Sequence, residues 1–149
     1  EALPSRTFLP ELKKRWPDLT AVEISDHTTA SELEMVRVLA QRSDIVIAGV
    51  FVRIASYSGR MDLSPAAVGL LSSLAVDEKR PLVTVVFGNP YTALALPKLP
   101  SVLLTYEFSD AMETAAARAL AGEIPIGGKL PITLPGLFPF GHGLTRPAM

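Results

Sequence analysis

Apolar side chains recur at helical spacing in four segments of the first 124 residues. One of them, Ala30–Arg42, carries apolar residues every three or four positions and is therefore predicted to be a helix. Thr29 precedes it, and Glu32 follows three residues later, which is the spacing of a capping box at a helix start. The other predicted helices are Phe8–Trp16, Pro65–Val76 and Asp110–Ala121.

Between these helices lie segments with the pattern of β-strands. Asp44–Ile54 is an almost continuous β-branched run, which is typical of a strand covered on both faces. Pro81–Phe87 and Ser101–Tyr106 have the same character, and Ala21–Ser25 alternates apolar and polar residues. Helices alternating with apolar strands predict an α/β fold, a three-layer α/β/α sandwich with a mainly parallel sheet. We also expect a strand before Phe8, because such a chain starts with one.

The chain changes character at Pro125. The last 25 residues contain five prolines, and four of them, Pro125, Pro131, Pro135 and Pro139, are interleaved with glycines. Proline lacks the N–H group that a sheet ladder requires, so we predict an extended surface tail over residues 125–149. The whole chain, 1–149, is predicted to be one domain, with an α/β core over 1–124.

Composition and charge narrow the function classes. Fourteen basic and fifteen acidic side chains give a formal charge of −1, which disfavours binding to nucleic acid. There is no cysteine, and His27 and His142 have no second ligand at metal spacing, so we expect no metal and no cofactor. The apolar runs have strand length, far below a membrane span of roughly 20 residues.

Candidate binding residues follow three predicted strands, because ligands of open α/β sheets lie at the carboxyl ends of strands. The Arg53–Arg60 loop offers arginines and hydroxyls that can hydrogen-bond sugar hydroxyls. Its candidate substrate-binding residues are Arg53, Ser56, Ser58 and Arg60, although a solvated turn at Gly59 explains the same loop.

The two other strand ends favour structural roles. Gly88–Tyr91 is interpreted as a tight turn with Asn89 as a helix cap, since it lacks a phosphate-binding fingerprint. Glu107 and Asp110 come closest in the sequence to the pair of carboxylates that a glycosidase uses. Asp110, however, is explained as an acid in the first turn of a helix, and Glu107 as an exposed residue at a strand end. No catalytic residue is therefore predicted.

Two segments of the tail resemble a known family. Gly122–Pro135 (GEIPIGGKLPITLP) and Phe138–Leu144 (FPFGHGL) resemble the end of the second domain of family 3 glycoside hydrolases. Val85–Tyr91 and Val50–Arg53 are similar to strands of that domain, so the resemblance covers nearly the whole chain. It implies a carboxyl-terminal domain that follows a (β/α)8 barrel, and the barrel supplies the nucleophilic Asp.

The loop Ala55–Arg60 departs from part of that family. In the β-glucosidase branch this region contributes an acid/base Glu, whereas the loop here retains Arg60 but has no carboxylate. This favours a resemblance to the β-N-acetylglucosaminidase branch, whose acid/base Asp-His pair lies in the barrel. The implied function is that of an accessory domain in retaining hydrolysis of terminal β-linked N-acetylglucosamine.

The resemblance also implies the partners of the chain. These are the amino-terminal barrel of the same protein and a carbohydrate substrate, and an extracytoplasmic location is favoured. Two alternatives stay open. One is a non-catalytic carbohydrate-binding or oligomerisation module, and the other is a flavodoxin-like binder of a small ligand.

Overall fold

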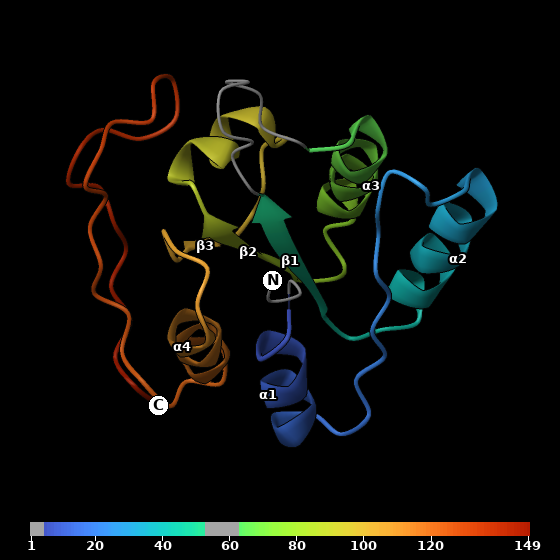
Figure 1. The fold of residues 1–149 in the computed structure, drawn as a ribbon, viewed down its shortest axis with the longest axis horizontal. Helices are drawn as coiled ribbons and strands as arrows, with labels where there is room; N and C mark the ends of the chain where they lie inside the picture. The colour runs from blue at the N-terminus through green and yellow to red at the C-terminus, as the bar shows by residue number, and fades with distance from the viewer. Residues whose placement is uncertain (1–4, 53–62) are drawn as a thin grey trace. The chain divides into compact units, whose positions relative to one another are not determined.

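The computed structural model describes residues 5–52 and 63–149 and divides into two compact units (Figure 1). One unit, Thr20–Tyr106, contains the sheet. The other joins Glu1–Leu19 to Glu107–Met149 and contains the first and last helices together with the tail.

The sheet of the first unit has three parallel strands. These are β1 (Val46–Val52), β2 (Leu82–Gly88) and β3 (Val102–Leu104), in the order β1-β2-β3. In β2 every residue except Val83 is buried, as its apolar run predicts for a central strand. The predicted α/β class and parallel sheet are confirmed, whereas the second helical layer of the sandwich stays a prediction.

Two helices accompany this sheet, and each begins at a side-chain cap. In α2 (Ala30–Gln41) the Thr29 hydroxyl accepts from the Glu32 N–H, and the Glu32 carboxylate accepts from the Thr29 N–H at 2.7 Å. In α3 (Pro65–Val76) the Ser64 hydroxyl accepts from the Ala67 N–H at 3.1 Å. Leu71 of α3 packs with Val50, Val52 and Val86 in a core between helix and sheet.

The strand predicted over Ala21–Ser25 is wrong for the described residues. The segment pairs with no described strand, and four of its five residues are exposed. Alternation of apolar and polar side chains favours an extended backbone, but a strand also needs a neighbour for its N–H and C=O groups. The predicted strand Ser101–Tyr106 is shortened to β3, and Tyr106 has a positive φ of 66°, outside the strand region.

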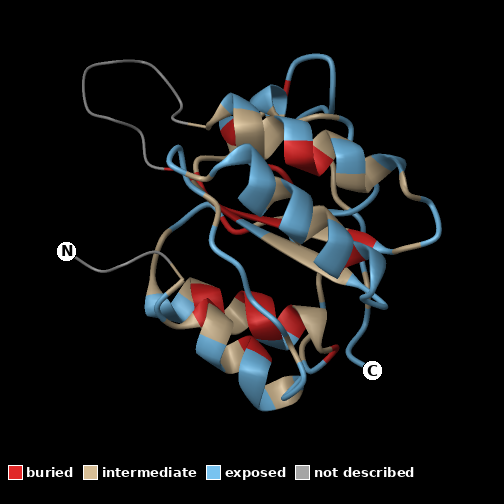
Figure 2. Cartoon of the chain, turned by 90° about the vertical axis from the view of Figure 1, so that its right-hand side faces the viewer, coloured by how far each residue is buried: buried red, intermediate tan, exposed pale blue. Residues whose placement is uncertain are grey.

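The second unit is built on α1 (Phe8–Arg15) and α4 (Asp110–Leu120), which contact each other. Phe8 and Leu12 are buried on α1, and small residues, Ala116, Ala117 and Ala119, are buried on α4 (Figure 2). Alanines let a neighbouring backbone approach closely. Glu113, also buried on α4, accepts from the N–H groups of Thr7 and Phe8 at 3.2 and 2.9 Å, so it caps the start of α1.

The tail has no helix and no regular strand, as predicted, but it doubles back on itself. Backbone hydrogen bonds join Ile126 to Arg146, Leu130 to His142 and Leu134 to Phe138. The two numbers of each pair add up to the same value, so the pairs form one antiparallel register. The arms meet around Gly136, whose φ of 77° suits a tight turn. We call residues 126–146 the tail hairpin.

Candidate binding sites

The carboxyl ends of β1, β2 and β3 meet at one edge of the sheet, because the three strands are parallel. β2 ends at Gly88, which has a φ of 96° and so permits the sharp turn that follows. Asn89 Oδ1 then accepts from the Tyr91 N–H at 2.8 Å and caps the 3-10 helix η1 (Pro90–Ala95). The predicted Asn cap is confirmed.

Two tyrosines follow neighbouring strands at this carboxyl edge. Tyr91 comes after β2 and Tyr106 after β3, and each is 41% exposed. Partial burial raises the pKa of the Tyr106 phenol, so the group stays protonated at neutral pH and can donate a hydrogen bond. Thr105, beside it, donates from its hydroxyl to the Val86 carbonyl at 3.2 Å and ties the end of β3 to β2.

The predicted substrate-binding residues of this edge are Arg53, Ser56, Ser58 and Arg60, and all four lie outside the described residues. Their role therefore stays a prediction. Sequence reasoning did not single out Tyr106. The positive φ of Tyr106, two residues after the end of β3, is revealed only by the backbone, since tyrosine carries no turn signal of its own.

Asp110 is confirmed as a structural acid in the first turn of α4. Its carboxylate accepts from the Thr7 hydroxyl at 2.5 Å and from the Arg6 guanidinium at 3.1 Å. These two contacts give a structural role to Asp110, one of the two carboxylates that the sequence analysis considered as a pair. They hold residues just before α1 against the start of α4.

Protein metal sites are built from groups of His, Cys, Asp or Glu side chains. Among the residues that the structure describes, no three His, Asp or Glu side chains gather in a metal-binding group. The His142 ring stacks on Phe138 with centroids 4.4 Å apart, across the tail hairpin. No helix among residues 5–52 and 63–149 has the length and apolar character to cross a membrane.

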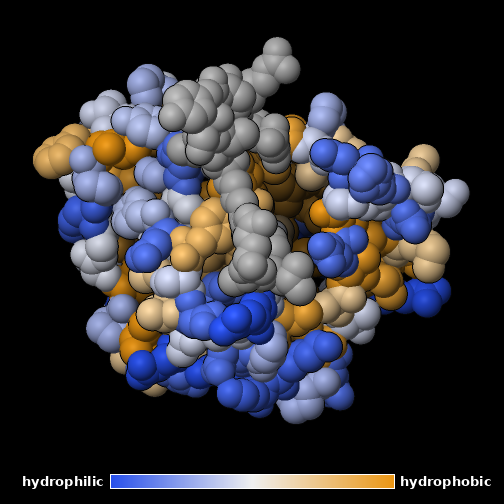
Figure 3. Space-filling view, in the orientation of Figure 1, coloured by the Kyte–Doolittle hydropathy of each residue, from blue (hydrophilic) through white to orange (hydrophobic). Residues whose placement is uncertain are grey.

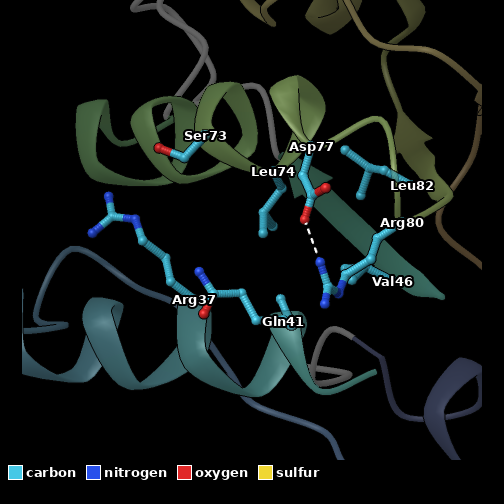
Figure 4. Close-up of a pocket in the computed structure, with 9 residues that line it drawn as sticks. Arg37, Gln41, Val46, Ser73, Leu74, Asp77, Arg80 and Leu82 are labelled. Atoms are coloured by element: carbon cyan, nitrogen blue, oxygen red, sulfur yellow. Dashed lines mark hydrogen bonds and ion pairs between the residues drawn. The ribbon is translucent and has the colours of Figure 1, made fainter. Parts of the chain in front are cut away.

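A cavity of about 220 Å³ lies between α2 and α3, at the amino ends of β1 and β2 (Figure 4). Arg37 and Gln41 line it from α2, whereas Asp77 and Arg80 come from the turn after α3. The Arg80 guanidinium donates to Asp77 at 2.6 Å, and this hydrogen bond lowers the pKa of the Asp77 carboxyl. Sequence reasoning missed this cavity because its walls come from four separate segments.

The polar groups of this cavity do not form a catalytic arrangement. Asp77 is its one carboxylate among the lining residues, and it is held by Arg80. Arg37 pairs with Glu34 on the same helix at 3.1 Å. Most glycoside hydrolases use two carboxyl groups, one on each side of the scissile bond. The residues that line this cavity do not provide such a pair.

No family model and no curated protein matches the sequence. Among solved structures, the chain is similar to a glycoside hydrolase family 3 β-N-acetylglucosaminidase from Paenibacillus sp. str. FPU-7. The TM-score is 0.72 at 26% sequence identity, covering 90% of this chain and 24% of that one. It is also similar to a fungal multi-domain GH3 β-N-acetylglucosaminidase described as having a GCN5-related glucosamine N-acetyltransferase region. There the TM-score is 0.74 at 26% identity, covering 94% of this chain and 15% of that one.

These findings confirm the resemblance first seen in the tail segments, on the level of tertiary structure. The chain resembles part of family 3 β-N-acetylglucosaminidases and spans about a quarter or less of the two similar chains.

Proposed function

We propose that this chain is the accessory carboxyl-terminal domain of a family 3 glycoside hydrolase that removes terminal β-linked N-acetylglucosamine. The observation that carries the proposal is the structural similarity over at least 90% of this chain to β-N-acetylglucosaminidases several times its length. The catalytic residues would lie in an amino-terminal (β/α)8 barrel of the same protein, and that barrel would be the principal partner of this domain.

The described residues agree with a supporting role. Asp110 and Glu113 are both engaged in capping contacts between α1 and α4. Asp77 is paired with Arg80. Most retaining glycosidases use one protonated and one ionised carboxyl group about 5 Å apart across the scissile bond. The acid-free loop Ala55–Arg60 adds no carboxylate, so acid/base catalysis would come from the barrel.

A direct test compares this chain with the full-length protein that contains it, using 4-nitrophenyl N-acetyl-β-glucosaminide as substrate. We expect turnover by the full-length protein and none by the 149-residue chain. The matched control is the full-length protein with its barrel nucleophile replaced by Asn, which should lose activity while this domain is unchanged. Turnover by the isolated chain would refute the proposal that catalysis belongs to the barrel and support to this domain. An inactive full-length protein would refute the proposed glycosidase activity.

A carbohydrate-binding role without catalysis is the second candidate, and the two half-exposed tyrosines at the carboxyl edge favour it. Aromatic side chains beside a few polar groups are common in ligand sites. Titration of the isolated chain with N-acetylglucosamine and chitobiose tests this by tyrosine fluorescence and calorimetry. Saturable binding that Tyr91→Ala weakens would support the role. Absence of binding would leave the domain with a scaffolding role alone.

The location of the full-length protein is a further part of the proposal. We propose an extracytoplasmic location, on the basis of the family resemblance alone. Fractionation of cells that express the full-length protein would test it, and retention in the cytoplasm would contradict it.

A further inference from the structure

Two arginines from separate segments line the cavity between α2 and α3. Arg37 belongs to α2, and Arg80 lies shortly before β2. In Figure 4 their guanidinium groups lie toward opposite ends of the cavity, and the Gln41 side chain lies between them. Two positive charges that share one small space repel each other, so an anion placed between them is favoured.

Most N–H groups of these two arginines are not engaged by the described residues. A guanidinium carries five N–H donors. Arg37 donates from Nη1 to Glu34 at 3.1 Å, and Arg80 donates from Nη1 to Asp77 at 2.6 Å. The Nε atom of Arg80 is buried and has no hydrogen-bond partner among the described residues. Because a carboxylate or a phosphate matches the fork of donors on a guanidinium, the cavity has the donors of an oxyanion site.

The existing contacts of the two arginines leave both side chains able to bind a ligand. Arg37 and Glu34 are three residues apart on one helix, and the Glu34 side chain is 67% exposed. Water screens such a pair, so a ligand can replace Glu34. Asp77 holds Arg80 more firmly, in a contact where both side chains are about two thirds buried. Arg80 is therefore fixed in position before a ligand arrives, which lowers the entropy cost of binding.

Hydrogen-bond donors, and not net charge, select the ligand of this cavity. Arg37 and Arg80 contribute two positive charges, and Asp77 contributes the one negative charge among the lining residues. α2 ends at Gln41 and α3 at Val76, and roughly half a negative charge at each helix end offsets that excess at long range. At contact distance the guanidinium N–H groups make hydrogen bonds to an anion, and hydrogen bonds between charged groups are about twice as strong as neutral ones.

The rest of the cavity wall is apolar. Val46 of β1, Leu74 of α3 and Leu82 of β2 contribute aliphatic side chains. On the surface, too, hydrophilic and apolar side chains adjoin each other over α2 and α3 (Figure 3). The volume of about 220 Å³ is below the range of about 300–1,000 Å³ for drug-sized ligands, so the ligand is small. A bare inorganic ion leaves the aliphatic wall uncovered, whereas a short carbon chain covers it.

We propose that this cavity binds a short aliphatic dicarboxylate. One carboxylate accepts hydrogen bonds from Arg37 and the other from Arg80, because the two guanidinium groups lie toward opposite ends of the cavity. The Gln41 amide donates to the ligand from between them. The carbon chain packs on Val46 and Leu74. The inference rests on this cavity and is independent of the glycosidase proposal.

Calorimetric titration of the 149-residue chain with succinate, at constant ionic strength, tests the proposal. We expect saturable binding of one succinate per chain. Butyrate has the same number of carbons but one carboxylate fewer, and phosphate has the charge without the chain. Each should bind at least about tenfold more weakly than succinate, because each loses one set of contacts. Absence of saturable succinate binding would overturn the site, and equal affinity for butyrate or phosphate would overturn the dicarboxylate.

A pair of arginine variants locates the binding site. Arg37→Met removes one of the two guanidinium groups and should lower the affinity for succinate at least about tenfold, to the level of butyrate. Arg42→Met is the matched control. It removes the same charge from an exposed residue directly after α2 that does not line the cavity, and it should change the affinity by less than about twofold.

Equal weakening in Arg37→Met and Arg42→Met would show that succinate responds to net charge alone, and it would overturn the site. The melting temperatures of both variants establish that they are folded. A second measurement does not depend on any substitution. Backbone amide shifts measured by NMR during the titration should change most at Gln41 and Leu74, and changes centred on another part of the chain would overturn the proposal.

Discussion

Gly143 and the backbone of Gly128 approach so closely in the tail hairpin that a Cβ on Gly143 would lie 2.2 Å from the Gly128 carbonyl oxygen. The Lys129 ammonium donates to the Gly143 carbonyl at 2.9 Å, next to this contact. The two tail segments that carry the family resemblance are therefore the two arms of one hairpin. The close contact between the arms accounts for the glycine at position 143 and for the lysine at position 129.

We predict that Gly143→Ala destabilises the chain by about 1–3 kcal/mol, because the added methyl group forces the two arms apart. The melting temperature measured by circular dichroism should fall accordingly. Gly127→Ala is the matched control, since a Cβ at Gly127 meets nothing within 4 Å. If both variants have the melting temperature of the unaltered chain, the contact between the arms does not constrain the fold.

Arg15 predicts how stability depends on pH. Its guanidinium makes two hydrogen bonds to Glu123, at 2.8 and 2.9 Å, and another to Glu11. The pKa of Glu11 is lowered mainly by its hydrogen bond from Lys14 and next by the one from Arg15. The pKa of Glu123 is lowered mainly by its hydrogen bonds from Arg15. Both carboxyls thus have a lower pKa in the folded chain. Their contribution is complete above the unfolded value, about 4.3, and is lost as pH falls through the folded values.

We therefore expect Arg15→Met to lower the urea midpoint at pH 7 and to leave a weaker loss of stability between about pH 5 and pH 3. Arg37→Met is the control, because Arg37 pairs with the well-exposed Glu34 and should have little effect on the pH profile. An unchanged acid profile in Arg15→Met would show that these two carboxyls do not set the acid sensitivity.

Glu113 is expected to stabilise the start of α1 from its position on α4. Glu113→Leu removes the acceptor for the Thr7 and Phe8 N–H groups and should cost about 1–3 kcal/mol. Glu113→Gln keeps an amide oxygen as acceptor and should cost less. Urea unfolding with an unchanged slope measures both values. Equal losses in the two variants would mean that volume or charge, and not the acceptor, is what α1 requires.

The capping box of α2 gives a local prediction. Thr29→Ala removes the hydroxyl that accepts from the Glu32 N–H and should destabilise by about 1 kcal/mol. Ser31→Ala, an exposed position within the helix, should be neutral or slightly stabilising because alanine favours helices. Thermal unfolding of the two variants distinguishes the cap from a general effect of alanine. A loss in Ser31→Ala equal to that in Thr29→Ala would contradict the cap.

The helix starts were predicted to within a residue, at Phe8, Ala30, Pro65 and Asp110. Their signals are local, because a capping hydroxyl and the N–H group that donates to it lie three residues apart, as in Thr29 and Glu32. The candidate site was less predictable. Tyr106 lies at the carboxyl edge of the sheet with a positive φ, and a tyrosine in the sequence gives no indication of that backbone conformation. The cavity between α2 and α3 depends on side chains from separate segments, such as Arg37 and Arg80.

The sequence by itself determined the α/β class, the parallel strands, the caps and the break at Pro125, since apolar period and turn chemistry act within a few residues. Only the tertiary structure decided that the tail folds into a hairpin, that Gly143 lies against Gly128, and that Ala21–Ser25 pairs with no described strand. These depend on which distant backbone groups meet. Hydrogen bonds between strands join residues far apart in the chain, and no local pattern records whether the neighbour of a strand is present.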